Sequence, residues 1–250
     1  MAITSFKRYE KKYLLTDEQF NALIPKLLEY MNPDEHCKEG NEYTIYNIYY
    51  DTDDNSIIKH SLSKPYYKEK LRLRSYSIPK SLDETVFLEL KKKIGGIVNK
   101  RRIVITLKQA YDLLNKGIRP DVSDYINTQI LNEIEYFLSK NKVHANPYIS
   151  YSRMAFFGKE DRDFRITFDT NITTRRYDIA LEKGNYGDEL LDEGEHLMEV
   201  KILGAMPVWI ARIFSELSIY STSFSKYGKE YKKYCSNEEY DKRKGIKVIC

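Results

Sequence analysis

The sequence predicts an α+β fold built around a large antiparallel β-sheet. Three observations indicate this class: strand-like segments alternate apolar with charged residues, a Gly-Gly turn joins two of them, and helical apolar spacing occurs between the groups of strands. The chain has 250 residues with 42% hydrophobic content, and it shows neither an internal repeat nor a long Gly/Ser/Pro linker. We therefore expect a single domain over residues 1–250.

The first half of the chain contains a run of predicted strands interrupted by one helix. In order, we expect a strand at about 8–15, a helix from the N-cap Thr16 to about Met31, and strands at 42–52, 69–76, 84–93 and 99–106. Because Gly95 and Gly96 form a tight turn between the last two strands, this region is expected to consist of antiparallel hairpins.

The second half alternates helices with further strands. We expect helices at about 107–115 and 123–140, strands at 147–157, 163–174 and 196–202, and a helix from Pro207 to about Tyr220. Ile126, Ile130 and Ile134 give the second of these helices its apolar spacing.

The strands carry an unusual pattern of charge. In "EKLRLRSY", Leu71 and Leu73 share one face while Arg72 and Arg74 share the other, because successive side chains of a strand point to opposite faces. Six more strands place charged or polar side chains on one face in the same way: Arg8, Glu10 and Lys12; Glu89, Lys91 and Lys93; Lys100 and Arg102; Tyr151 and Arg153; Arg165, Thr167 and Asp169; and Glu199 and Lys201.

Two interpretations of these faces are open. The simpler one is a solvated face opposite a helix-covered face. The second is a sheet curled into a barrel with the charges inward. The composition of the charged faces favours it, because Arg and Lys recur with single carboxylates and few small polar residues. Burying so many cations would cost several kcal/mol per ion without a partner, so a chain of phosphates would have to supply the missing charge. The carboxylates would suit a divalent metal on the same phosphate oxygens.

Composition excludes several other classes. With 41 basic and 37 acidic residues, the net charge of +4 is only a weak argument for nucleic acid, and we expect no nucleic-acid partner. The three cysteines have no metal or redox spacing, the four histidines are unclustered, and no P-loop is present. The N-terminus has no apolar signal region and no apolar run is long enough to span a bilayer, so we expect a cytoplasmic protein without a transmembrane segment.

Eight motifs in one order resemble a known family: "RYEKKY", "NIYYDT", "EKLRLRSY", "FLELKKKIGGIVNKRR", "YISYSR", "FRITFDTNI", "LMEVKI" and "FSKY". This order resembles the VTC (vacuolar transporter chaperone) catalytic domain, within the CYTH-like triphosphate tunnel metalloenzymes. The match covers about residues 5–235, which is the expected core, and leaves 236–250 as a charged tail. The resemblance implies an antiparallel β-barrel with flanking helices, a triphosphate or polyphosphate ligand in its tunnel, a divalent metal (Mn²⁺ or Mg²⁺) and, in eukaryotic members, polyphosphate synthesis from ATP.

The resemblance also assigns roles to individual residues. It implies catalytic roles for Arg72, Arg74, Lys91, Arg153 and Lys226. It implies substrate contacts for Lys12, Lys100, Tyr151, Arg165, Lys201 and Ser225, and metal binding by Glu199. Glu10 is either a second metal carboxylate or a partner in a salt bridge.

The expected function is a polyphosphate polymerase that transfers the γ-phosphate of ATP onto a growing chain. Phosphoryl transfer needs positioning and charge neutralisation more than a nucleophilic side chain. Two alternatives stay open: a metal-dependent triphosphatase, favoured by Ser223 where the eukaryotic pattern has a lysine, and a non-catalytic sensor of polyphosphate, inositol polyphosphate or nucleotide. Arg8, where the phosphatase branches carry a glutamate, favours the polymerase. The product would remain in the cytoplasm, or it would need a separate membrane-protein partner for its export.

Overall fold

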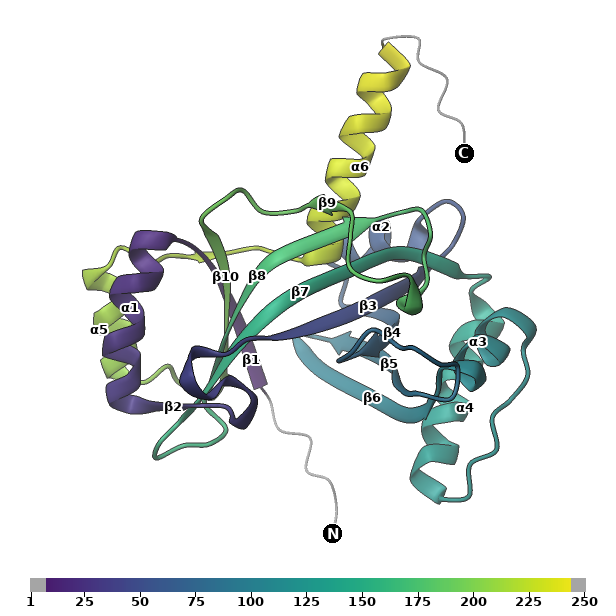
Figure 1. Cartoon of the computed structure of the whole chain (residues 1–250), viewed down its shortest axis with the longest axis horizontal. Helices are drawn as coiled ribbons and strands as arrows, with labels where there is room; N and C mark the ends of the chain where they lie inside the picture. Colours follow the sequence, from purple (N-terminus) through teal and green to yellow (C-terminus); the bar gives the residue numbers. More distant parts are fainter. Residues whose placement is uncertain (1–7, 244–250) are drawn as a thin grey trace.

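The computed structural model describes the backbone of residues 8–243 and the side chains of residues 9–37 and 41–237. These residues form one antiparallel sheet of eleven strands together with six α-helices. Figure 1 shows the helices in groups around the strands, with α1 and α5 on one side and α3 and α4 on the other. The predicted α+β class is confirmed.

The strands follow one another around a curled wall. Their bounds are β1 (Arg8–Thr16), β2 (Met31–Pro33), β3 (Tyr43–Asp51), β4 (Tyr67–Ser75), β5 (Thr85–Ile94), β6 (Ile97–Thr106), β7 (His144–Gly158), β8 (Arg165–Arg175), β9 (Asp188–Glu189), β10 (Glu195–Leu203) and β11 (Ser221–Thr222). The main order is β11-β1-β10-β8-β7-β3-β4-β5-β6, with β2 on β7 and β9 on β8.

The barrel has a seam where the two edges of the sheet meet, with β11 and β1 on one side and β6 on the other. Within the described part of the chain, backbone hydrogen bonds do not connect β6 to β1 or β11. Side chains approach across this seam instead, since Lys91 Nζ lies 3.9 Å from a Glu10 carboxylate oxygen. The predicted antiparallel barrel is therefore confirmed as an architecture in which the sheet curls round without a continuous hydrogen-bonded ladder.

The helices are α1 (Asp17–Tyr30), α2 (Ser56–Leu62), α3 (Leu107–Lys116), α4 (Tyr125–Lys140), α5 (Val208–Glu216) and α6 (Lys226–Arg243). Helices α3 and α4 pack on the outward apolar faces of β4, β5 and β6, where Leu88, Leu131 and Phe137 are buried together. Helices α1 and α5 cover β8 and β10 in the same way. Because the apolar side chains of these strands face outward onto helices, their charged side chains face the barrel interior.

Local capping sets the helix starts. Thr16 and Gln19 form a reciprocal capping box at α1, as the predicted N-cap required. Helix α4 begins at Tyr125 rather than at 123, because the carboxylate of Asp124 accepts the backbone N–H of Asn127 and makes Asp124 the N-cap. Helix α5 ends at Glu216 instead of continuing to Tyr220, and Ser218 turns the chain with a φ of 53°.

Two helices were not predicted. Helix α2 has only seven residues and follows Asn55, which adopts a left-handed conformation. Helix α6 starts at the "FSKY" motif and continues to Arg243, so it extends into the segment expected to be a charged tail. Residues 244–250 of that expected tail lie outside the described residues. In Figure 1, the C-terminal part of α6 projects away from the sheet.

Candidate active site in the barrel interior

Cross-strand register brings the predicted site residues together inside the barrel. Arg72 on β4 is directly opposite Glu89 on β5, and Lys12 on β1 is opposite Glu199 on β10. Arg153 on β7 is opposite Asp169 on β8. In each of these three pairs, opposite charges face each other across the ladder, an arrangement that stabilises a sheet.

Glu89 is the carboxylate of the first charge cluster. Its side chain is only 1% exposed and lies among four cations. Arg102 Nε donates to it at 2.6 Å, Arg72 Nε at 3.1 Å and Lys100 Nζ at 3.5 Å, while Arg74 Nε lies at 4.0 Å. Burial alone would raise the pKa of Glu89, but these cations, Arg72 first, hold it well below its usual value. Glu89 therefore stays ionised and neutralises part of the arginine row.

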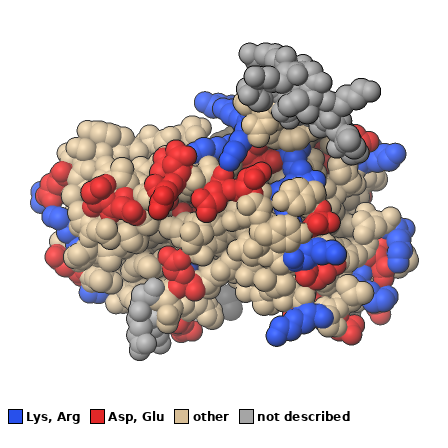
Figure 2. Space-filling view, turned by 45° about the horizontal axis from the view of Figure 1, so that its top comes forward, with Lys and Arg blue, Asp and Glu red and all other residues tan. Residues whose placement is uncertain are grey.

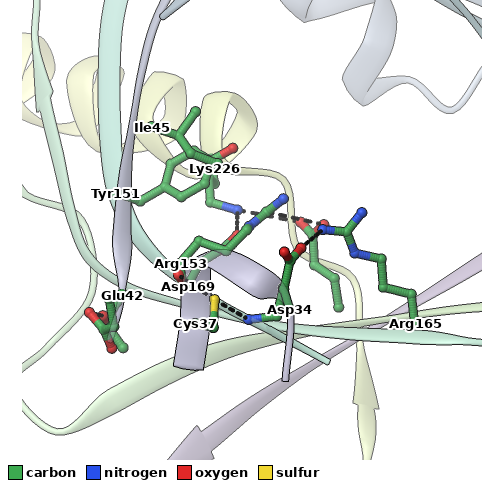
Figure 3. Close-up of polar contacts among 12 residues, drawn as sticks. Asp34, Cys37, Glu42, Ile45, Tyr151, Arg153, Arg165, Asp169 and Lys226 are labelled. Carbon is green, nitrogen blue, oxygen red and sulfur yellow. Dashed lines mark hydrogen bonds and ion pairs between the residues drawn. The ribbon is translucent and has the colours of Figure 1, made fainter. Parts of the chain in front are cut away.

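Asp169 and Glu199 form the second charge cluster, and Figure 3 shows Asp169 beside Arg153 and Lys226. Arg153 donates two hydrogen bonds to Asp169, at 2.6 and 2.7 Å, and Lys226 also donates to Asp169. Lys226 Nζ lies 3.4 Å from Glu199, and Lys12 Nζ lies 3.2 Å from it. Although burial would raise the pKa of Glu199, Lys12, Lys226 and Arg153 keep it well below its usual value. Burial would likewise raise the pKa of Asp169, but Arg153 and Lys226 lower it, so the cluster favours the ionised form of both carboxylates.

Tyrosine and asparagine side chains orient the two arginines of β4. Arg74 donates to Asn47 Oδ1 at 2.9 Å and to the Tyr151 hydroxyl at 3.0 Å. Arg72 donates to the Tyr49 hydroxyl at 3.3 Å. Tyr151 also presents its ring to Lys226, whose Nζ lies 4.3 Å from the ring centroid. These contacts hold the guanidinium groups in fixed directions, which suits recognition of phosphate oxygens.

Lys70 and Lys201 face the interior and have no carboxylate within ion-pair distance among the described residues. Burial, followed by the like charges of Lys68, Lys91 and Lys12, lowers the pKa of Lys70 to about 7. Burial also lowers the pKa of Lys201 to about 8, against the attraction of Glu199. The interior thus carries cationic groups that its own carboxylates do not neutralise.

Helix α6 positions Lys226. Ser225 precedes the helix, and its hydroxyl accepts the backbone N–H of Gly228 at 3.2 Å, as an N-cap does. The hydroxyl of Tyr227 donates to Asp51, which also accepts backbone N–H groups from the start of α2. The Arg176 guanidinium pairs with Glu230 through two hydrogen bonds of 2.6 and 2.9 Å. The start of α6 is therefore held by its own N-cap and by side-chain contacts with Asp51 and Arg176.

The remaining predicted residues lie around these clusters. Lys91 and Lys100 are partly exposed on the interior face of β5 and β6. Arg165 pairs with Asp34 at 3.3 Å (Figure 3) and lies over the Phe157 ring, and its ion pair is with neither Glu89, Asp169 nor Glu199. Ser225 has the capping contact just described, and its predicted contact with substrate stays a prediction.

The metal prediction can be compared with the available oxygen ligands. No group of three or more His, Cys, Asp or Glu side chains within the described residues is arranged to hold a metal ion. Glu10 and Glu199 nevertheless approach the same Lys12 Nζ, at 3.3 and 3.2 Å. Mg²⁺ commonly uses only one or two carboxylates together with substrate phosphates. The two glutamates therefore fit an ion that shares its coordination with a phosphate ligand, and in the structure Glu10 forms salt bridges with Lys12 and Lys91.

Four interior residues were not assigned to the site from sequence: Lys70, Glu89, Arg102 and Asp169. Alternation had placed the last three on the charged faces, and Lys70 shares the face of Arg72. The alternation of side chains along each strand was therefore the sequence signal that could have assigned these four residues to the interior. What alternation does not give is the register that makes Glu89 and Asp169 the centres of their clusters.

The outer surface contrasts with this interior. In the face shown in Figure 2, acidic and basic side chains are intermixed, without a continuous basic patch in that view. A cavity of about 440 Å³ between α1 and β7 is lined mainly by apolar side chains such as Phe20, Ile24 and Met154. Such a wall does not suit a polyanion, so the barrel interior is the candidate phosphate site.

A family model of the VTC domain matches residues 7–235. The chain belongs to the VTC domain family. No curated protein sequence matches this VTC domain. Within its described residues, no helix is long and apolar enough to cross a membrane.

Solved structures share the fold at low sequence identity. A "putative adenylate cyclase" from Bacillus halodurans is 18% identical with a TM-score of 0.52, and the alignment covers 88% of this chain and 95% of that chain. The adenylyl cyclase homologue HpAC1 from Hippeastrum, described as having a dominant triphosphatase activity, is 14% identical with a TM-score of 0.50, covering 88% of this chain and 93% of that chain. These similarities confirm the CYTH-like fold, and the family match assigns the chain to the VTC domain family.

Proposed function

We propose that this VTC domain is a polyphosphate polymerase, which transfers the γ-phosphate of ATP onto a polyphosphate chain inside the barrel. The observation that carries the proposal is the unneutralised charge of the interior. Lys70 and Lys201 have no carboxylate within ion-pair distance among the described residues, and burial lowers the pKa of both. A phosphate chain would supply the missing negative charge, and its binding would then be strongly favoured.

The interior residues would act by position and charge. Arg72 and Arg74, already oriented by tyrosine and asparagine partners, would bind phosphate oxygens and align the chain. Lys226 would move between Asp169, Glu199 and the oxygens of the transferring group, because it lies beside both carboxylates. A loose phosphoryl-transfer transition state spreads charge over its oxygens, and such fixed cations stabilise that charge.

A divalent ion, Mn²⁺ or Mg²⁺, would be held by Glu199 with Glu10 as the second carboxylate, and it would further neutralise the phosphate oxygens. Because Lys12 contacts both carboxylates, it would have to shift toward the phosphates when the ion binds. Lys12, Lys91, Lys100, Arg153, Arg165 and Lys201 complete the proposed set of phosphate contacts.

A second candidate is a triphosphatase, in which water replaces the acceptor chain. The triphosphatase activity stated for the Hippeastrum protein favours it, because that protein shares the fold. Ser223 also favours it, since this side chain stands exposed where the family's second lysine was expected. A sensor that binds phosphate chains without turnover is the third reading of the same interior.

The test is to incubate the purified protein with ATP and Mn²⁺ and to resolve the products on a gel while free phosphate is assayed. A long phosphate polymer with stoichiometric ADP, lost in Glu199→Gln, supports the polymerase. Free phosphate without polymer would replace it with a triphosphatase, and binding without turnover would replace it with a sensor. Glu133→Gln is the matched control, because Glu133 pairs with Lys92 and Arg101 outside the interior clusters. We place the reaction in the cytoplasm, where the chain would stay unless a membrane-protein partner exports it.

A further inference from the structure

Four aromatic side chains form a continuous arc, here called the aromatic rim: His36, Tyr43, Tyr76 and Phe87. The ring centroids of Tyr76 and Phe87 lie 5.4 Å apart, those of Tyr43 and Tyr76 lie 6.3 Å apart, and those of His36 and Tyr43 lie 5.9 Å apart. Tyr43 shares the interior face of β3 with Asn47, and Phe87 shares that of β5 with Glu89. The rim therefore borders the phosphate-binding interior.

The rim is in contact with the arginines of that interior. Arg102 lies over the Phe87 ring at 4.5 Å and donates to the Tyr76 hydroxyl at 3.2 Å. Arg74 lies 6.0 Å from the Tyr76 ring centroid. A ligand whose phosphates contacted Arg74 and Arg102 would thus have its adjoining group beside these rings.

The rim is not simply part of the hydrophobic core. Tyr76 is 43% exposed, whereas the core tyrosine Tyr148 is 0% exposed. An accessible aromatic side chain beside guanidinium groups is the usual platform for a planar base, because every nucleobase offers a π-face for stacking. Packing among the rings themselves accounts for their spacing but not for the exposure of Tyr76.

The other ends of β4 and β5 have a different character. There, Lys68 lies opposite Lys93 and Lys70 lies opposite Lys91. Like charges directly opposite one another destabilise a sheet, so this lysine end is built for anions. Tyr76 lies eight residue steps beyond Lys68 along the strand, which is about 26 Å at roughly 3.3 Å per step. The interior therefore has an aromatic end and a lysine end.

We propose that the aromatic rim binds the base of a nucleoside triphosphate, so that the phosphates point inward toward the lysine end. This inference rests on the proposed function only in requiring that the interior binds triphosphate. It gives the barrel a direction: the nucleoside stays at the aromatic rim, and the growing phosphate chain extends along the lysine end. It also assigns base recognition to stacking, which predicts little discrimination between purines.

The experiment compares two ligands that differ only in the nucleoside. Dissociation constants of ATP and of inorganic tripolyphosphate are measured by calorimetry for the wild type, Tyr76→Ala and Tyr76→Phe. We expect Tyr76→Ala to weaken ATP binding about tenfold and to leave tripolyphosphate within twofold. Tyr76→Phe keeps the ring, so it should retain most of the ATP affinity. Tyr125→Ala, which removes an 80% exposed tyrosine on α4, is the matched control and should change neither constant.

The outcomes separate this inference from the function on which it rests. The base site is overturned if Tyr76→Ala loses affinity for ATP and tripolyphosphate equally. It is also overturned if this variant melts like the wild type and loses affinity for neither ligand. Both results leave the proposed phosphate site standing. If the wild type binds neither ligand, the proposed function fails and the base site fails with it.

Discussion

The charge balance of the interior makes Glu89→Gln a demanding test. The substitution keeps the size of a side chain that is 1% exposed and removes only its charge. Arg72, Arg74, Lys100 and Arg102 then lose their shared counter-charge. We expect the protein without phosphate to be destabilised and the protein with phosphate to recover, because a bound polyanion would replace the carboxylate.

The magnitude follows from burial. Removing one partner from a buried ion pair costs about 3–5 kcal/mol. Lys100 and Arg102 are 45% and 29% exposed, so solvent screens part of the repulsion and the low end, about 3 kcal/mol, applies. For a chain of this size, 1 kcal/mol shifts the melting temperature by roughly 2–4 °C. The expected fall is therefore about 6–12 °C.

The assay is thermal unfolding with and without saturating tripolyphosphate, beside Glu133→Gln as the control. Glu133 is partly exposed and pairs with Lys92 at 2.9 Å and Arg101 at 3.1 Å outside the barrel interior, so its loss should cost about 1 kcal/mol. Tripolyphosphate should at least halve the deficit of Glu89→Gln and leave that of Glu133→Gln unchanged. A deficit below about 3 °C, or one that tripolyphosphate does not reduce, would refute the balance of charges described for the interior.

Three further predictions follow from single contacts. The pKa of Lys70 is about 7 in the free protein and a bound phosphate would raise it, so the affinity for tripolyphosphate should weaken as the pH rises above 7. Calorimetry on Lys70→Arg should find that the affinity depends less steeply on pH, and an unchanged pH dependence would contradict this role of Lys70. Asp51→Asn removes the carboxylate that accepts two N–H groups of α2 and the Tyr227 hydroxyl, so urea unfolding should show a loss of about 2–3 kcal/mol, and a loss below about 1 kcal/mol would contradict its role. If Ser225 acts as an N-cap, Ser225→Ala should cost about 1 kcal/mol and Ser225→Gly only a few tenths; equal losses of activity at unchanged stability would favour substrate contact instead.

The interior faces could be predicted because strand alternation is a local property. Leu71 and Leu73 are buried at 0% exposure against helices, while Arg72 and Arg74 face the interior, as the period of two requires. A strand prediction therefore sorts side chains between the two faces even when its ends are misplaced by a residue or two.

The charge clusters could not be predicted in the same way. Glu89 contacts Arg72 and Arg102, which lie 17 and 13 residues away, through the registers of two hairpins. Alternation leaves those registers undetermined, so Glu89 was indistinguishable from any other carboxylate on a charged face.

Helix α6 was missed for a different reason. Tyr227, Glu230, Tyr231 and Tyr234 recur at helical spacing, but tyrosines and charges give little apolar contrast in so polar a segment. The spacing was visible in the sequence. Tertiary contacts identify the buried face of the helix, namely the contact of Tyr227 with Asp51 and the ion pair of Glu230 with Arg176.

The most direct test of the central proposal is a crystal structure of the protein soaked with tripolyphosphate and Mn²⁺. We expect phosphate density within hydrogen-bonding distance of Arg72, Arg74 and Lys226, and an anomalous manganese peak beside Glu199. Phosphate bound on the outer surface, with the interior ion pairs of Glu89 and Asp169 unchanged, would contradict a phosphate-binding interior.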